Sequence, residues 1–237
     1  MPGFILHLSA GVLAIDAFQN LNFHMSSREK NDFLMGCLLP DASKKKDASH
    51  FRNPKHHGNI VEYPDLELLE QKYHGLLGDM SCLGYEFHLY IDRVFFKDYL
   101  PRIVEFQDDA GKVVKKWTDV TWAVLRKNHK RLKVKQFFSE DYYYGDYTKM
   151  NSWLIDKLHI PLTLQTDVKN PGIEEVDYAK GKDILEELKG YLDVPKEAIA
   201  ELKVFDVEDL LGFLKKKTQI WCESKIQDMA HRNEVLK

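Results

Sequence analysis

The sequence is poor in cysteine, and the few cysteines it has form no recognisable site. Cys37, Cys82 and Cys222 lie far apart, and no C-x-x-C pair is present. Such a sparse, odd set fits reduced, buried thiols better than a disulfide framework. We therefore expect a cytoplasmic protein in which a metal site, if present, uses nitrogen and oxygen ligands.

Long apolar runs are also missing. No stretch approaches the roughly 18 uninterrupted apolar residues that a membrane-spanning helix needs. The N-terminal run PGFILHLSAGVLAIDAF is apolar, but it lacks a basic leading region and is interrupted by His7 and Asp16. We expect neither a signal peptide nor a transmembrane segment.

An excess of charge of one sign is absent over the whole chain. The formal net charge is −3, so contact with a nucleic acid or an anionic membrane requires a local patch. The segment RKNHKRLKVK at 126–135 is such a candidate, but a run of this kind is usually a solvated helix face. We therefore do not expect a nucleic-acid partner.

Signals for β-sheet are weak throughout the sequence. We find no convincing run of alternating strands, no sheet-type hairpin and no internal repeat. The 237 residues, 44% of them hydrophobic, suffice for a sizeable core. We predict an all-α, multi-helix bundle in one domain spanning residues 1–237, with a metal-site half over 1–100 and a packing half over 101–237.

Apolar residues at helical spacing predict where the helices lie. Ser26 or Ser27, followed by Glu29, predicts a cap before the helix NDFLMGCLL, which should end at Pro40. We expect the other helices at about 4–17, 65–77, 81–100, 112–132, 184–192 and from 206 onward.

Two further segments have no clear helical pattern. The polar stretch at 41–64 is long for a connection inside a compact domain, and such loops are usually functional or disordered. Its apolar residues favour an ordered loop. The aromatic segment FFSEDYYYGDYTKMNSWL predicts either a ligand pocket or a core seam, with Asp146 and Asn151 as its notable polar members.

The helix expected at 81–100 carries His88 and Asp92, four residues apart. This spacing places an imidazole and a carboxylate on one helix face, about 6 Å apart along the axis. Most neighbouring residues are apolar, which predicts a central, buried helix. The pair is either a hydrogen-bonded core pair or two ligands of one metal ion.

Other candidate ligands precede this helix. His7 lies in the first turn of the first helix, Asp41 follows Pro40, and His50 lies in the polar loop. Each has an ordinary structural explanation when taken alone. Taken together with His88 and Asp92, they form a set of imidazoles and carboxylates that suits zinc, iron or manganese.

The order and local context of these five residues resemble a known family. The segments are MPGFILHLSAG, GCLLPDAS, KDASHFR and LGYEFHLYID, within roughly the first hundred residues. They resemble the zinc-dependent phospholipase C family, which is similar to the single-strand nucleases of the same all-α metal-hydrolase fold. The resemblance implies that His50, His88 and Asp92 hold one zinc ion, that His7 and Asp92 hold another, and that Asp41 is a ligand or the catalytic general base.

The sequence departs from this family in its later histidines. The family's third metal requires a later pair of histidines with a nearby glutamate, but no H-x-x-x-E is present, and His129 and His159 are isolated. A site with one or two ions is therefore expected. The family's secreted members also use a mature N-terminal amine as a ligand, which follows signal cleavage.

The resemblance implies a metal-dependent hydrolase that uses a metal-activated water on a phosphodiester or phosphomonoester. A small phosphoester or a phospholipid headgroup is the expected substrate. Lys46 and Arg52 are candidate substrate contacts, and His56 and His57 are candidate accessory groups, although a solvated loop explains all four. The alternative is a non-catalytic all-α protein with a structural or regulatory metal site.

Overall fold

The computed structural model describes residues 3–73, 76 and 78–235, and within this part the protein is mostly helical with one small sheet. The helices are α1 Phe4–Asn20, α2 Ser27–Gly36, α3 Leu39–Ala42, α4 Lys46–Ser49, α5 Leu66–Tyr73, α6 Met80–Val94, α7 Leu100–Ile103, α8 Val134–Phe137, α9 Tyr143–Leu158, α10 Gly181–Lys189 and α11 Val207–Val235. The strands are β1 Val104–Gln107, β2 Trp122–Leu125 and β3 Arg131–Lys133. The protein is therefore predominantly α-helical, which confirms the helical part of our fold prediction, and the small sheet is a feature that the prediction lacks.

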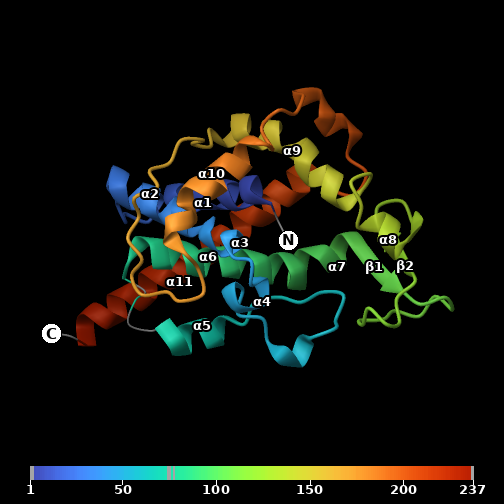
Figure 1. Ribbon diagram of the computed structural model, residues 1–237, viewed down its shortest axis with the longest axis horizontal. Coiled ribbons are helices and arrows are strands. Elements are labelled where there is room, and N and C mark those ends of the chain that lie inside the picture. Colours follow the sequence, from blue (N-terminus) through green and yellow to red (C-terminus); the bar gives the residue numbers. More distant parts are fainter. Residues whose placement is uncertain (1–2, 74–75, 77, 236–237) are drawn as a thin grey trace.

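Helix α6 runs through the middle of the molecule and continues towards the sheet (Figure 1). Its N-cap Asp79 accepts hydrogen bonds from the backbone N–H groups of Ser81 and Cys82. Nearly every residue of the helix is buried, as its all-round apolar pattern predicts. We predicted that this helix ends at Pro101, and that prediction is wrong. A π-helical turn at Phe95–Tyr99 leads into α7. Pro101 lies in the first turn of α7, where a helix does not need the backbone N–H that proline lacks.

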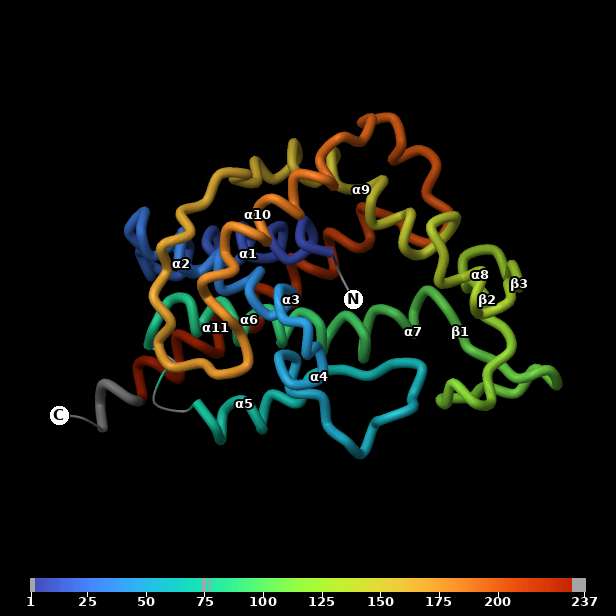
Figure 2. Tube along the Cα trace, in the orientation of Figure 1, coloured from blue at the N-terminus to red at the C-terminus, as the bar shows by residue number. Residues whose placement is uncertain are grey.

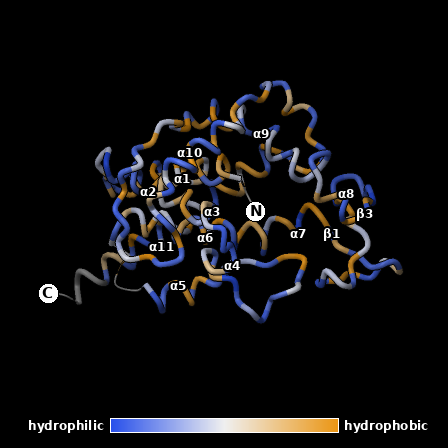
Figure 3. Tube along the Cα trace, in the orientation of Figure 1, coloured by the Kyte–Doolittle hydropathy of each residue, from blue (hydrophilic) through white to orange (hydrophobic). Residues whose placement is uncertain are grey.

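Helices α1 and α11 pack against one another beside α6. The four residues expected to face inward from the last helix are all buried, which confirms that prediction: Leu210, Leu211, Leu214 and Trp221. The ring of Trp221 lies 4.6 Å from Phe87 of α6 and 5.8 Å from Phe18 of α1. Figure 3 shows hydrophobic and hydrophilic residues interspersed along the line from α6 to β1.

The start of α2 is as predicted. The Ser26 side chain accepts from the Glu29 backbone, and the Glu29 carboxylate accepts from the Ser26 backbone, which completes a capping box. The helix ends at Gly36, earlier than expected, and Pro40 lies inside the one-turn helix α3 together with Asp41.

Helices α2 and α6 approach so closely that their backbones touch. A Cβ atom on Gly36 would overlap the carbonyl oxygen of Ser81, and one on Gly84 would overlap that of Phe33. Only glycine fits at these two positions, because any side chain would force the helices apart. This crossing fixes the start of the 37–50 segment relative to α6.

The three strands form an antiparallel sheet in the order β1-β2-β3. Gln107 pairs with Trp122 in the first ladder, and Trp122 pairs with Lys133 in the second. Residues 112–132, for which we predicted a helix, instead contain β2 and the start of β3 joined by turns and loops, so that prediction is wrong. The segment is rich in residues that favour strands, namely Val113, Val114, Val120, Thr121, Trp122 and Val124.

The basic run at 126–135 therefore spans a hairpin rather than a helix face. Its tight turn places His129 at a φ of 56°, and the Asn128 side chain accepts from the backbone of Lys130. Trp117, expected to point inward, is 47% exposed. All six lysines and arginines of the run are exposed. The charges are therefore solvated as expected, but they do not lie on one helix face.

Two other predicted helices have these outcomes. Helix α5 is described over Leu66–Tyr73, and Leu77, placed on its apolar stripe, lies outside the described residues. Helix α10 ends at Lys189, so that Tyr191 lies beyond it and is 41% exposed. The polar stretch at 41–64 is ordered, with α3, α4 and a 3₁₀ turn at Pro54–His56.

The polar members of the aromatic segment have packing roles. The Asp146 carboxylate accepts hydrogen bonds from three consecutive backbone N–H groups at Lys203, Val204 and Phe205. The Asn151 side chain donates to the Tyr191 carbonyl. These bonds tie α9 to the segments on either side of the 3₁₀ turn at 196–201. Within the described ranges, we find no helix with the length and hydropathy to cross a membrane.

Replacing Gly84 with alanine tests the close contact of α2 and α6. We expect Gly84→Ala to lower the free energy of unfolding by about 1–3 kcal/mol, because the added methyl overpacks the crossing. Gly212→Ala is the matched control, since Gly212 is also helical but has open space at its Cβ position. That variant should gain about 0.5–1 kcal/mol. Equal stability of the two variants in urea unfolding would contradict the contact.

Candidate metal centre

Helix α6 places His88 and Asp92 one turn apart on the same face. His88 is 0% exposed and Asp92 is 1% exposed. The Nε2 atom of His88 lies 3.9 Å from Asp92 Oδ2. The spacing that the sequence predicts is therefore present, and both polar groups are enclosed in the core.

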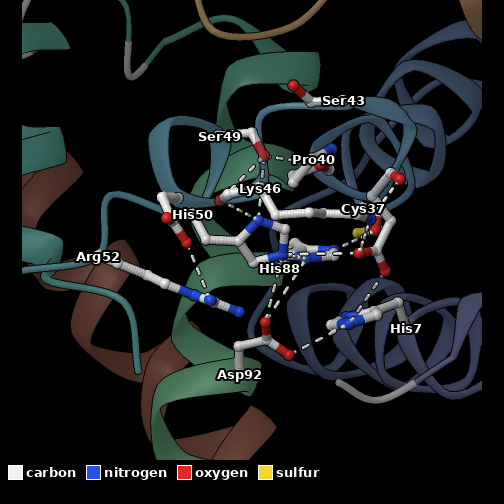
Figure 4. Close-up of polar contacts among 12 residues, drawn as sticks. His7, Cys37, Pro40, Ser43, Lys46, Ser49, His50, Arg52, His88 and Asp92 are labelled. Atoms are coloured by element: carbon white, nitrogen blue, oxygen red, sulfur yellow. Dashed lines mark hydrogen bonds and ion pairs between the residues drawn. The ribbon is translucent and has the colours of Figure 1, made fainter. Parts of the chain in front are cut away.

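Three other elements bring the remaining predicted residues to this pair. His7 comes from α1, Asp41 from α3, and His50 directly follows α4. Figure 4 shows His7 and His50 converging on His88 and Asp92, and Asp41 Oδ1 lies 3.5 Å from His50 Nε2. The structure thus gathers all five residues, which we call the His–Asp cluster, in one place.

The two carboxylates of the cluster each lie between two imidazoles. Asp92 Oδ1 is 3.4 Å from His7 Nε2, and Asp92 Oδ2 is 3.5 Å from His50 Nε2. Asp41 repeats the arrangement, with Oδ1 at 3.5 Å from His50 Nε2 and Oδ2 at 4.0 Å from His7 Nε2. Asp92 is thus placed to be shared between two ions, and Asp41 is placed in the same way.

Backbone carbonyls hold two of the imidazoles. His88 Nδ1 lies 2.7 Å from the Cys37 carbonyl, and His50 Nδ1 lies 3.1 Å from the Lys46 carbonyl. A carbonyl only accepts hydrogen bonds, so each Nδ1 carries the proton and each neutral ring presents a lone pair at Nε2. This is the usual arrangement around histidines that ligate a metal.

The two Nε2 atoms of His50 and His88 face one another at 3.2 Å. Two neutral rings in this tautomer cannot bond to one another, because both atoms are acceptors. A proton or a cation must therefore lie between or beside them. The arrangement suits a cation, which uses both lone pairs at once.

Several buried polar atoms of the cluster have no hydrogen-bond partner within the described part of the chain. They are both ring nitrogens of His7 and both carboxylate oxygens of Asp92. A buried polar atom without a partner costs about 1–3 kcal/mol, and more for a charged group. The cluster is thus incomplete as a hydrogen-bonded core, and the atoms without partners include candidate metal ligands on His7 and Asp92.

The pKa values also follow from burial and charge. Burial lowers the pKa of His88 to about 3, so its imidazole is neutral at neutral pH. Burial alone would raise the pKa of Asp92 and of Asp41. The neighbouring imidazoles lower both pKa values, Lys46 also acts on Asp41, and the net direction is downward. Both carboxylates are therefore ionised at neutral pH.

The separations between ligand atoms match a small coordination shell. Bonds of about 2.0–2.1 Å around a tetrahedral zinc place its ligand atoms about 3.4 Å apart. His50 Nε2, His88 Nε2 and Asp92 Oδ2 lie 3.2–3.9 Å from one another. Two groups of three residues have ligand atoms within 4.8 Å of one another: one is His7, His88 and Asp92, and the other is Asp41, His50 and His88. His88 has a single lone pair at Nε2 and can ligate one ion, so the two groups are alternative ligand sets around that ion.

Lys46, one of the candidate substrate contacts, touches the cluster directly. Lys46 Nζ lies 2.7 Å from Asp41 Oδ1. The Arg52 guanidinium lies beside the cluster in Figure 4 and pairs with the Asp47 carboxylate at 3.0 Å.

The other two candidates contact different groups. The His56 ring packs on Tyr63, with centroids 5.2 Å apart. His57 is exposed, and its Nδ1 lies 3.8 Å from a Glu62 carboxylate oxygen. The surface explanation therefore holds for His57, and His56 belongs to a different part of the molecule.

A cavity of about 420 Å³ borders the cluster through Asp41 and Lys46. Its wall contains three tyrosines and two glutamates, namely Tyr144, Tyr147, Tyr191, Glu140 and Glu187. The aromatic segment thus contributes both to a pocket and to the core, where Tyr143 is buried. The cavity gives a small molecule access to the ionised Asp41 carboxylate.

Sequence reasoning missed the residues that orient the ligands. Ser49 Oγ lies 3.0 Å from His50 Nδ1 and donates to the Pro40 carbonyl, while the Tyr85 hydroxyl donates to the Ser49 carbonyl. Ser49 immediately precedes His50 in the sequence, but neither its contacts nor the role of the Cys37 carbonyl has a sequence signal.

We find no match between this chain and any protein-family model, curated protein or solved structure.

Ser49→Ala tests the support of His50. The change removes the hydroxyl that contacts Nδ1, and we expect an affinity for Zn²⁺ about tenfold weaker in equilibrium dialysis. Ser43→Ala is the control, because Ser43 lies in the same segment and its Oγ accepts from the Lys45 backbone. Wild-type affinity in Ser49→Ala would contradict the orienting role.

Two further variants test how the ligands are shared. Asp92→Asn should lose more bound Zn²⁺ than His7→Ala, because Asp92 contacts imidazoles on both sides and His7 lies on one side only. Elemental analysis after dialysis gives the number of ions per chain, and circular dichroism confirms folding. Full metal content in folded Asp92→Asn would rule out the shared position.

Proposed function

We propose that the protein is a metal-dependent phosphoester hydrolase whose metal is held by the His–Asp cluster. The observation that supports this most strongly is the set of donor atoms without partners that face one another inside the core, beside a cavity. Three imidazoles and two carboxylates suit zinc, and iron or manganese accept the same ligands. The zinc-dependent phospholipase C family, which the sequence motifs resemble, supports the same reaction class.

The bound cation would supply Lewis acidity, which lowers the pKa of a water molecule towards neutrality and offsets the charge of a phosphoester. Each cluster residue then has a definite task. His50 and His88 present their Nε2 lone pairs, and the backbone carbonyls at Nδ1 keep those rings in place. Asp92 lies between His7 and His50 and completes the ligand set.

Asp41 is better suited to binding the metal than to accepting a proton. Its pKa is held well below the usual range by the imidazoles around it and by Lys46. An efficient general base has a pKa near the working pH, so a strongly acidic carboxylate is a weak base. We therefore assign Asp41 the ligand role among the two that the family resemblance implies.

Lys46 is the residue of the chain that we assign to the substrate phosphate. Its side chain is 35% exposed, its ammonium group lies 2.7 Å from Asp41 Oδ1, and both residues line the cavity. From there it can neutralise a phosphate oxygen, and the wall tyrosines can pack against an apolar or aromatic leaving group. Substrates that fit this cavity are small phosphoesters or the headgroup of a phospholipid.

A structural metal site is the second candidate, and one observation favours it. Four of the five cluster residues, His7, His50, His88 and Asp92, are at most 1% exposed. A site closed in this way would hold metal for stability and would leave no position open for water. The two functions differ in whether the metal-loaded protein hydrolyses a phosphoester.

One experiment tests both the metal and the reaction. We expect the purified protein to contain metal and to hydrolyse bis(p-nitrophenyl) phosphate or p-nitrophenyl phosphate, with activity lost on adding a chelator. His88→Ala should lose both metal and activity, because His88 belongs to both ligand groups. His57→Ala should retain both, because His57 is exposed and contacts Glu62.

The outcomes separate the two functions. Full metal content in His88→Ala would overturn the metal site and with it the proposed reaction. Loss of metal in His88→Ala, together with no hydrolysis of either ester by the metal-loaded wild type, would favour the structural site.

A further inference from the structure

A second cavity, of about 440 Å³, lies at the sheet end of the molecule, and no residue of the His–Asp cluster lines it. Its floor is the stretch from the π-helical turn to β1, with Phe96, Leu100 and Val104 in the wall. The loop that contains His56 closes one side, and the connection between β1 and β2 closes another. Figure 2 shows these two connections approaching one another below β1.

Backbone hydrogen bonds tie these two connections together. The Ile60 N–H donates to the Lys115 carbonyl at 2.8 Å, and the Trp117 N–H donates to the Gly58 carbonyl at 3.0 Å. Asn59 and Lys116 form an antiparallel bridge between these bonds. This part of the cavity wall thus consists of two segments that are held together by backbone hydrogen bonds.

The lining of this cavity is mainly apolar. The apolar and aromatic residues in the wall are Ile60, Val61, Tyr63, Phe96, Leu100, Pro101, Val104, Phe106, Val113 and Val114. Cavities of about 300–1,000 Å³ with mostly apolar walls and a few polar groups are typical of sites for small molecules. The volume and the lining therefore fit a compact apolar ligand or a single alkyl chain.

The charged groups of the wall have an excess of positive charge. Arg126 donates to the Glu105 carboxylate at 2.9 Å, so these two charges compensate one another. Lys97 and Lys115 also line the cavity, and neither has an ion-pair partner within the described ranges. An anionic group at the cavity could thus pair with these lysines without displacing an internal ion pair.

We propose that this cavity binds a monoanionic amphiphile, namely a single apolar chain that ends in a carboxylate, as in a medium-chain fatty acid. The apolar wall takes the chain, and Lys97 and Lys115 take the carboxylate. An uncharged chain uses only the wall, and a cationic amphiphile is repelled by the two lysines. The site is independent of the proposed phosphoester hydrolysis.

Titration calorimetry with dodecanoate below its critical micelle concentration tests the site. We expect saturable binding of one molecule per chain. Butyrate, which has the same head but little apolar surface, and dodecyltrimethylammonium, which has the opposite charge, should each bind at least tenfold more weakly. No binding of dodecanoate, or equal binding of the cationic amphiphile, would overturn the proposal.

Variants locate the site and separate its two parts. Replacing Lys97 and Lys115 together with alanine should weaken dodecanoate binding at least fivefold and leave dodecanol binding unchanged. Val114→Trp should weaken both, because the larger ring fills the cavity. Lys112→Ala is the control, since Lys112 is exposed and does not line the cavity.

Folding and metal content of these variants provide the last check. Thermal unfolding by circular dichroism and elemental analysis should match the wild type for the lysine variants, because neither lysine contacts the His–Asp cluster. Wild-type affinity for dodecanoate in the folded double-lysine variant would place the carboxylate elsewhere and overturn the assignment. The hydrolysis assay is not used as a readout, so failure of the proposed reaction leaves this test intact.

Discussion

The close crossing of α2 and α6 is the constraint on which the rest of the structure depends. Gly36 and Gly84 allow the two backbones to touch, and α2 ends at the first of them. The next residue, Cys37, therefore has its carbonyl beside α6, where it accepts from His88. A contact between two backbones thus fixes the orientation of an imidazole one turn further along α6.

Burial of the His–Asp cluster is the second constraint, and it costs free energy. Packing the core around α6 removes water from Asp92 and His7, whose polar atoms lack partners in the described part of the chain. Desolvating a charge without a partner costs several kcal/mol. The close packing that orients the ligands therefore creates a need for a compensating charge, and a cation at the cluster would meet it.

Much of the helical framework and the composition of the cluster were predictable from sequence. The Ser26 and Glu29 pattern predicts the start of α2 because capping depends on neighbouring residues alone. His88 and Asp92 meet because helical spacing fixes their relative position. Tertiary packing brings His7, Asp41 and His50 to this pair, and helical spacing alone does not predict it. Only the resemblance of the motifs to a known family led us to expect these residues together.

The sheet and the cavities were not predictable in the same way. Residues 112–132 have apolar positions that suit a helix, but the local preference of Val and Trp for strands and the pairing with β1 decide the outcome. Trp117 is exposed because its segment pairs with the loop at 58–60, far away in sequence. Cavities arise from such long-range pairings, so the periodicity of apolar residues along the sequence does not predict them.

The space between the Nε2 atoms of His50 and His88 can be occupied in two ways. A proton on His50 Nε2 would allow a hydrogen bond to His88 Nε2 at 3.2 Å and would offset part of the carboxylate charge. A metal ion uses the same two lone pairs. A proton and a metal ion therefore compete for the same lone pairs. A core His–Asp pair and a metal site are thus two states of one arrangement, and the occupant of the space between the Nε2 atoms decides which is present.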